Sequence, residues 1–228
     1  MADKEQKTDA SEDGSLRAIR LEKLAALRKL GVDPYPYGFA VTASAAGLAK
    51  RYEGLATGAQ TEDAVSIAGR IRAIRNSGMF IDLHDTSGKI QVFCHKDYLS
   101  AEQLEIVRLL DLGDIIGVEG LIRRTPRGEL SVNARAVSVL AKALLPLPEK
   151  YHGLADIELR YRQRYVDLIV TEQSRETLRK RSRVISVFRR VLGERGALEV
   201  ETPMLHTIPG GASARPFVTH HNALDIDL

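Results

Sequence analysis

The chain has one cysteine, Cys94, in 228 residues, so no disulfide can form within it. It has no apolar run near the roughly 18 residues that a membrane-spanning helix needs. Its start, Met-Ala-Asp-Lys-Glu-Gln-Lys, lacks the apolar stretch of a secretory signal. These absences exclude a scaffold held by internal disulfides and argue against membrane insertion. We therefore expect a cytoplasmic protein that keeps its thiol reduced.

The sequence also offers little for metal binding or nucleophilic catalysis. Its six histidines show no ligand spacing. His220 and His221 are adjacent, so on a strand they point to opposite faces and do not share a metal ion. Cys94 alternates with Ile90 and Val92 on an inward face, which predicts a core residue and not a nucleophile. We expect no metal site made by this chain alone.

Composition is that of an ordinary globular protein of one or two domains, with 44% hydrophobic and 28% charged residues. The net charge is only +3, but residues 155–196 hold eleven Lys and Arg against six Asp and Glu. Two interpretations of this basic segment stay open. It contacts phosphate groups, or it is a solvated helix face that also forms ion pairs between subunits.

The N-terminal part divides at residue 14. Residues 1–14 mix acidic and basic side chains, which predicts a disordered tail. Residues 15–59 form a helical segment, whose first helix has apolar residues near helical spacing and ends at Gly31 and Pro34. These apolar residues are Leu16, Ile19, Leu24, Leu27 and Leu30.

From Val65 the apolar period changes to two, the period of a strand. The pattern predicts strands near 65–72, 79–84, 90–95, 114–124 and 129–140, with a helix near 101–110. This order is that of the OB-fold, a small five-stranded barrel, and the helix after the third strand distinguishes it from an SH3-like barrel. We place this domain at residues 60–146, before the two prolines of Leu144-Leu-Pro-Leu-Pro148.

Residues 147–228 are predicted to form a second domain. We expect a helix near 159–169 and a longer one from Ser174, acting as N-cap, to about residue 194. A strand at 197–202 would end at Pro203. The loop Ile208-Pro-Gly-Gly-Ala-Ser-Ala-Arg-Pro216 lets backbone approach a ligand, but it matches neither a Walker A loop nor a Rossmann fingerprint. A plain flexible loop is the alternative.

The outer face of the predicted barrel is the main candidate for a binding site. Phe80 lies on the polar side of its strand, and the alternation puts Gln91 and Arg70 on a similar outer face. An exposed aromatic ring beside an amide and a guanidinium can stack on an unpaired base and bond its edge. Alternatively, Phe80 packs under a helix or loop. Glu129 either accepts hydrogen bonds from base amino groups or is a solvated carboxylate.

In this order the segments resemble a class II lysyl-tRNA synthetase of the bacterial type, over residues 15–228. The resemblance is carried by Leu144-Leu-Pro-Leu-Pro148, Tyr151-His-Gly-Leu154, Arg160-Tyr-Arg-Gln-Arg-Tyr-Val-Asp-Leu168, Val200-Glu-Thr-Pro-Met204, Ile208-Pro-Gly-Gly-Ala-Ser-Ala-Arg-Pro-Phe217 and His220-His-Asn-Ala-Leu-Asp225. It implies an α+β chain: a five-stranded OB-fold barrel with an N-terminal helix, followed by an incomplete class II antiparallel α/β catalytic domain at 147–228.

The resemblance also implies a function, namely ATP-dependent activation of lysine and its transfer to tRNA(Lys) by a homodimer that uses Mg²⁺. The residues implied to bind the anticodon are Phe80, Gln91, Arg70 and Glu129. Gly211 would contact lysine through its backbone. The residues implied at the dimer interface, in motif 1, are Leu178, Ile185, Phe188 and Pro203.

The family's motifs 2 and 3, with their ATP-binding arginines, would lie beyond Leu228. The carboxylates that recognise lysine and hold Mg²⁺ would lie there too. We therefore expect no catalytic residue in this chain, no ATP or Mg²⁺ held by it, and no aminoacylation by it alone. The other hypotheses are a stand-alone module that binds tRNA or single-stranded RNA, a synthetase for aspartate or asparagine, and an enzyme that charges a lipid head group, which would need a membrane region.

Overall fold

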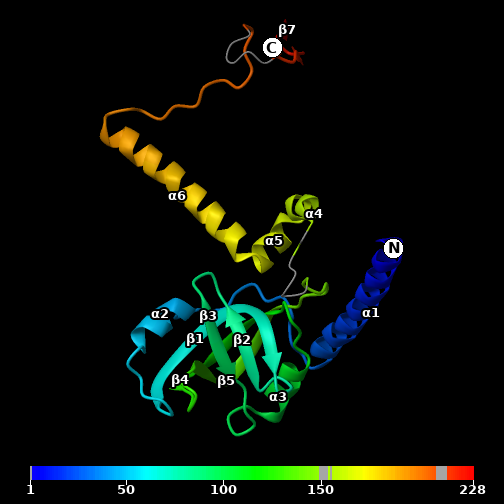
Figure 1. Cartoon of the computed structure of the whole chain (residues 1–228), viewed down its shortest axis with the longest axis vertical. Coiled ribbons are helices and arrows are strands. Elements are labelled where there is room, and N and C mark those ends of the chain that lie inside the picture. Colours follow the sequence, from blue (N-terminus) through cyan, green and yellow to red (C-terminus); the bar gives the residue numbers. More distant parts are fainter. Residues whose placement is uncertain (1, 149–153, 155, 209–214) are drawn as a thin grey trace. The chain divides into compact units, whose positions relative to one another are not determined.

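The computed structural model describes residues 2–148, 154, 156–208 and 215–228, and it divides into two compact units, Met1–Gly153 and Leu154–Leu228 (Figure 1). This division lies close to the predicted boundary at residue 146. Within the described ranges, no helix is long and apolar enough to cross a membrane.

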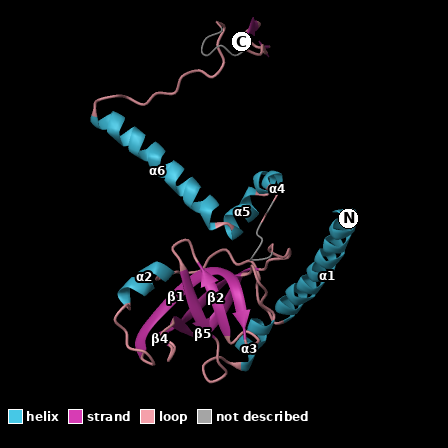
Figure 2. Ribbon diagram, viewed as in Figure 1, coloured by secondary structure: helices cyan, strands magenta, loops and turns pink. Residues whose placement is uncertain are grey.

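The first unit is a closed barrel with additional helices (Figure 2). Its elements are α1 (Ala2–Lys29), α2 (Ala45–Arg51), β1 (Gln60–Arg75), β2 (Phe80–His84), β3 (Lys89–Phe93), α3 (Ala101–Arg108), β4 (Ile115–Arg124) and β5 (Leu130–Ala141). The strand order is β1-β2-β3-β5-β4, and β3 and β5 run parallel where the barrel closes. The predicted OB-fold is confirmed, including the helix between the third and fourth strands.

The barrel interior is filled by the apolar residues that the alternation placed inward. Ile71, Ile81 and Val92 are fully buried, and Cys94 is buried beside them in the same core. Gly120 is required by a close backbone approach, since a Cβ there would lie 2.2 Å from the carbonyl oxygen of Asn133. The strand residues that alternate with these core residues lie on the outer face of the barrel, where a ligand can bind.

Helix α1 differs from the prediction in two ways. It begins at Ala2, so residues 2–14 are helical where we expected a disordered tail. Once a helix is nucleated, each added residue gains a hydrogen bond, and no proline interrupts this segment. Of the predicted apolar stripe, Leu24 and Leu27 are buried, whereas Leu16, Ile19 and Leu30 are exposed. Only part of the stripe packs on the barrel.

Polar contacts fix the C-terminal half of α1 to the end of the barrel. The Arg20 guanidinium donates to the carbonyl oxygens of Ala143 at 3.0 Å and Leu145 at 2.9 Å. The Lys23 ammonium pairs with the Asp111 carboxylate at 2.5 Å. The helix therefore holds the segment through which the chain leaves β5.

A buried ion-pair cluster lies beneath this contact. The Lys142 ammonium pairs with Asp114 at 2.8 Å and with Asp111 at 2.5 Å, and the Lys142 and Asp114 side chains are both 0% exposed. Asp114 also accepts hydrogen bonds from the backbone N–H groups of Asp111 and Ala143. Burial opposes ionisation of Asp111, but hydrogen bonds and charge from Lys142 and Lys23 outweigh it and lower the pKa of Asp111.

The second unit contains α4 (Ile157–Arg162), α5 (Arg164–Val170), α6 (Glu172–Glu194), β6 (His220–His221) and β7 (Ile226–Asp227). The helix predicted at 159–169 is two helices separated at Gln163. The strand predicted at 197–202 is not formed in the described part of the chain. A strand needs a neighbour for its N–H and C=O groups, and no described strand pairs with this segment.

A buried carboxylate organises the three helices. Asp167 is fully buried and pairs with Arg160 at 3.0 Å and with Arg164 at 2.6 Å. Ser174 is not the N-cap of α6, which is Thr171; the Ser174 hydroxyl instead accepts a hydrogen bond from Arg160 at 2.9 Å. Two arginines of the basic segment therefore have a structural role.

Candidate nucleic-acid interface

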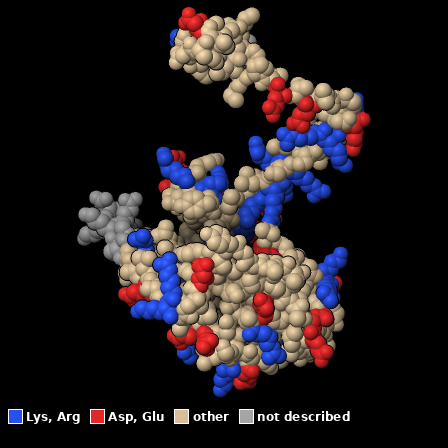
Figure 3. All heavy atoms as spheres, turned by 180° about the vertical axis from the view of Figure 1, so that it is seen from behind, with Lys and Arg blue, Asp and Glu red and all other residues tan. Residues whose placement is uncertain are grey.

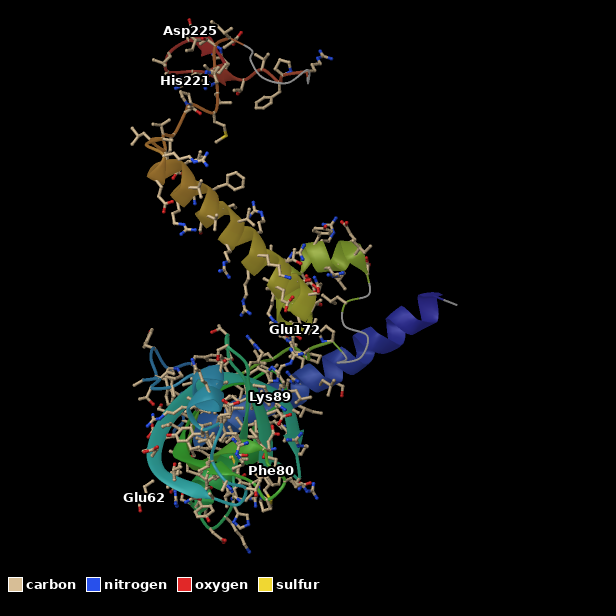
Figure 4. All side chains as sticks on the ribbon, turned by 60° about the vertical axis from the view of Figure 1, so that its left-hand side comes forward. Glu62, Phe80, Lys89, Glu172, His221 and Asp225 are labelled. Atoms are coloured by element: carbon tan, nitrogen blue, oxygen red, sulfur yellow. The ribbon has the colours of Figure 1, made fainter. Side chains whose placement is uncertain are left out.

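The candidate site is the outer face of β1, β2 and β3. Phe80 starts β2 and is half-buried, while the next residue, Ile81, points into the core and is fully buried. Figure 4 shows Phe80 at the side of the barrel. The Phe80 ring contacts that of Phe93 on β3, with centroids 5.1 Å apart and planes at 39°. The ring that Phe80 contacts therefore belongs to the sheet and not to a covering helix or loop.

Gln91 lies on the same face, on the strand next to that of Phe80. It is the register partner of Asp82, two residues along β2 from Phe80. The Gln91 side-chain oxygen accepts a hydrogen bond from the Ser131 hydroxyl at 2.9 Å. The NH₂ group is the donor half of the Gln91 amide, and the residue is 8% exposed. The structure therefore brings Phe80 and Gln91 together as predicted.

Arg70 is not brought to Phe80. It pairs in register with His84, at the other end of β2. Its guanidinium donates to the carbonyl oxygen of Gly113 at 2.7 Å. Burial lowers the pKa of Arg70, and the negative charge of Asp114 offsets only part of this effect. Arg70 therefore contributes to the barrel end and not to the Phe80 site.

Arg75 occupies the position that we expected for Arg70. It is the register partner of Phe80, and its guanidinium binds Asp82 at 2.7 Å while its side chain stays 49% exposed. The register between β1 and β2 shifts between Ile71 and Ala73. Such a β-bulge adds one residue to a strand, so strict alternation counted from the first strand cannot identify the arginine opposite Phe80.

Glu129 lies at the edge of the same face. It immediately precedes β5 and is exposed, and its carboxylate is 3.4 Å from the Lys89 ammonium. Lys89 and Gln91 share one face of β3, since they are two residues apart. Glu129 therefore lies beside the face of β3 that carries Gln91.

Aromatic rings continue beyond Phe80 in what we call the aromatic strip: Phe80, Phe93, His95 and Tyr98. The Phe93 and His95 rings are nearly parallel, at 9° and 5.4 Å, and His95 and Tyr98 are 6.3 Å apart. Two guanidinium groups lie over the strip. Arg123 is 4.7 Å from the Phe93 centroid, and Arg135 is 4.5 Å from that of Tyr98.

One buried acceptor beside the strip lacks a partner among the described residues. Asn133, the register partner of Phe93, donates through its side chain to Gln60 at 2.9 Å, but its Oδ1 atom accepts no hydrogen bond in the described structure. Leaving a buried acceptor unsatisfied costs about 1–3 kcal/mol.

The predicted dimer residues of the second unit are accessible in the single chain. Phe188 is 65% exposed and Leu178 39%, Ile185 is half-buried, and Pro203 is exposed. Lys and Arg side chains gather along α6, which carries Leu178, Ile185 and Phe188 (Figure 3). Gly211 lies outside the described residues.

Cys94 has the properties of a core residue, as predicted. It is 3% exposed, and burial raises the pKa of its thiol to about 12. Across the described ranges, no three His, Cys, Asp or Glu side chains gather as a metal ion would require. Neither a nucleophile nor a metal ion can be assigned to the described site.

Two segments of the chain match known protein families. Residues 65–140 match the OB-fold nucleic acid binding domain, and residues 156–227 match the family described as tRNA synthetases class II (D, K and N). The chain therefore combines an anticodon-type OB-fold with part of a class II synthetase domain.

The chain is a homologue of lysine–tRNA ligase. It is 52% identical over all 228 residues to the enzymes of Sinorhizobium medicae (strain WSM419) and Rhizobium meliloti (strain 1021), of which it covers 45%. It is also 52% identical over 219 residues to that of Ectopseudomonas mendocina (strain ymp), covering 95% of this chain and 43% of the relative. The chain thus spans less than half the length of these relatives.

Proposed function

We propose that these residues are the anticodon-binding part of a lysine–tRNA ligase that works in the cytoplasm. The whole enzyme would activate lysine with ATP and transfer it to tRNA(Lys). Identity of about half across the full chain supports this, as does the match of each unit to a synthetase-type family. Aspartate and asparagine enzymes share the class II family, but the relatives cited above are all lysine enzymes.

The observation that carries the proposal is the group formed by Phe80, Gln91 and Arg75. An unpaired base stacks on the Phe80 ring. The NH₂ of Gln91 donates to a carbonyl of that base, such as those on the edge of uracil. Arg75, held by Asp82, presents its remaining N–H donors to the same nucleotide. The central anticodon uridine is the substrate position that these donors fit.

The experiment is a binding titration of the chain with the anticodon stem-loop of tRNA(Lys). Phe80→Ala should weaken binding by about 1–3 kcal/mol, the worth of one stacked base. Arg75→Ala should weaken binding more than Arg70→Ala, because Arg70 faces Gly113 at the other end of β2. Unchanged affinity in a folded Phe80→Ala variant would make Phe80 a packing residue and refute the proposal.

The second unit is proposed to form a homodimer through the exposed stripe of α6. Burying Leu178, Ile185, Phe188 and Pro203 against a second copy would remove apolar surface from water. Basic side chains of α6 such as Arg181 and Arg183 would then lie beside the interface, where they would pair between subunits or contact phosphate.

ATP, Mg²⁺ and lysine are proposed substrates and cofactors of the whole enzyme. The described residues do not fit Mg²⁺, since they contain no cluster of suitable ligands, so no step is assigned to it. Gly211 is proposed to touch lysine. We propose that residues 1–228 alone do not activate lysine, because by resemblance motifs 2 and 3 follow Leu228. Lysine-dependent exchange of pyrophosphate into ATP by the purified chain would refute this.

A stand-alone RNA-binding module is the second candidate function. It is favoured by one observation: Phe80, Gln91, Arg75 and Glu129 all lie in the first unit. The source DNA separates the two candidates. A stop codon directly after Leu228 favours the module, and continuation into further strands with arginines and glutamates favours the ligase.

A further inference from the structure

We propose that Arg124 and Asp85 are positioning residues of the anticodon site. They act through helix α2 on the two turns that precede Lys89 and Glu129, at the edge of the site. Neither positioning residue contacts the RNA itself; each one joins an end of α2 to one of the turns. This inference rests on the proposed anticodon function, and it gives a role to α2, which the site described above does not use.

The first support is the place of Arg124 between α2 and the turn that joins β4 to β5. Its guanidinium donates to the carbonyl oxygen of Tyr52, the C-cap of α2, at 2.7 Å and to that of Glu53 at 3.3 Å. The same guanidinium donates to the carbonyl oxygen of Gly128 at 2.8 Å. Because a guanidinium is planar and rigid, these bonds fix the end of α2 against the backbone that directly precedes Glu129.

The β4–β5 turn, residues 125–129, is closed by hydrogen bonds of its own. The Thr125 backbone N–H donates to the carbonyl oxygen of Glu129 at 2.9 Å, and the Glu129 N–H donates to the Thr125 hydroxyl at 3.0 Å. The Gly128 N–H donates to the carbonyl oxygen of Thr125 at 2.8 Å, and Gly128 has a φ of +86°. Since the turn is held as one unit, the contact that Arg124 makes at Gly128 also fixes Glu129.

The second support is at the opposite end of α2, where Asp85 lies in the turn that joins β2 to β3. Its carboxylate accepts a hydrogen bond from the backbone N–H of Ala45, the first residue of α2, at 2.7 Å. It also accepts from the backbone N–H groups of Ser87 at 2.7 Å and Gly88 at 2.8 Å. Burial opposes ionisation of Asp85, but these hydrogen bonds outweigh it and lower its pKa. Because Lys89 follows Gly88, this carboxylate joins the start of α2 to the backbone beside Lys89.

The two turns meet where the Lys89 ammonium lies 3.4 Å from the Glu129 carboxylate. The contacts of Arg124 and Asp85 with α2 and with these turns, which we call the α2 clamp, therefore form a closed circuit on the barrel. Helix α2 packs against β3 (Figure 1) and has only seven residues, too few to be stable alone in water. It keeps its place through buried Leu48 and the clamp, so losing either end should release both turns.

The test is a double-mutant cycle with the 228-residue chain and the anticodon stem-loop of tRNA(Lys). Glu129→Gln should weaken binding by the wild-type chain about 2- to 13-fold, the effect of losing one hydrogen bond. In the Arg124→Ala or Asp85→Ala background it should weaken binding by less than about 2-fold, because Glu129 is no longer held toward the RNA. In the Arg127→Ala background, which removes an exposed arginine of the same turn, the full effect should remain.

Hydrogen exchange separates positioning from a general loss of stability. Arg124→Ala should speed exchange of the Ala45 N–H, at the far end of α2, while buried Cys94 stays protected from labelling. Asp85→Ala supplies the binding test if the Arg124 variant does not fold. An unchanged Ala45 rate would show that α2 transmits nothing and would overturn the proposal.

The cycle itself gives the other decisive results. If Glu129→Gln has the same effect in every background, or no effect in the wild-type chain, the positioning role is refuted. The anticodon proposal then still stands or falls with Phe80→Ala. If the wild-type chain does not bind the stem-loop at all, the anticodon proposal itself fails.

Discussion

Replacing Lys142 by methionine should destabilise the barrel by about 3–5 kcal/mol, the usual cost of removing one partner of a buried ion pair. Methionine keeps the length of the side chain, so the loss comes mainly from charge. Asp114 would stay buried without its cation at 2.8 Å, and Asp111 would keep only Lys23. Two backbone N–H groups still bind Asp114, which places the expected loss near 3 kcal/mol.

The assay is urea unfolding followed by circular dichroism and by labelling of Cys94. Since Cys94 is buried in the barrel core, its labelling reports the opening of the first unit alone. Lys89→Met is the matched control, because its pair with Glu129 is exposed and worth at most about 1 kcal/mol. Asp114→Asn added to Lys142→Met should recover part of the loss. If Lys142→Met costs no more than Lys89→Met, the cluster does not stabilise the barrel.

Three further predictions follow from other contacts. The lowered pKa of Asp111 contributes stability above its unfolded value of about 3.9, and this is lost as pH falls through the lower folded value. Acid titration of Lys23→Met should show a smaller loss than that of wild type. Phe188→Asp should shift any dimer toward monomer, measured by sedimentation, whereas Glu194→Gln should leave the dimer fraction unchanged. Ser131→Ala should reduce the preference for uracil over cytosine at the central anticodon position, measured with two stem-loops, because the Gln91 amide is then free to rotate.

Much of the barrel could be predicted from the sequence because its strands alternate over a common core. Val65, Ile67 and Ile71 alternate between the two register shifts of β1, and Ile90 and Val92 alternate on a regular strand. These runs predict the strands and place Phe80 and Gln91 on the outer face. Here local pattern and tertiary packing agree, which is the condition under which periodicity is informative.

The parts that could not be predicted depend on extra residues or on distant partners. Alternation assumes two residues per repeat, so it fails where a bulge adds one. It placed Arg70 near Phe80, whereas the register shift between Ile71 and Ala73 makes Arg75 the partner of Phe80. Ser174 has the residue type of an N-cap, but its hydroxyl is used by Arg160, fourteen residues earlier in the chain. No local pattern carries that information.

In the proposed complex, recognition of the base edge would depend on barrel closure as well as on the side chains that face the RNA. β3 and β5 are distant in sequence and run parallel where the barrel closes, and this pairing places Ser131 beside Gln91. The Ser131 hydroxyl donates to the Gln91 oxygen, so in the proposed complex the amide would present its NH₂ donor to the base. The opposite orientation would suit cytosine, whose amino group is a donor, better than uracil. In the proposed complex, the hydrogen bond between Ser131 and Gln91 would therefore also favour uracil, whereas the Phe80 ring would stack on any base.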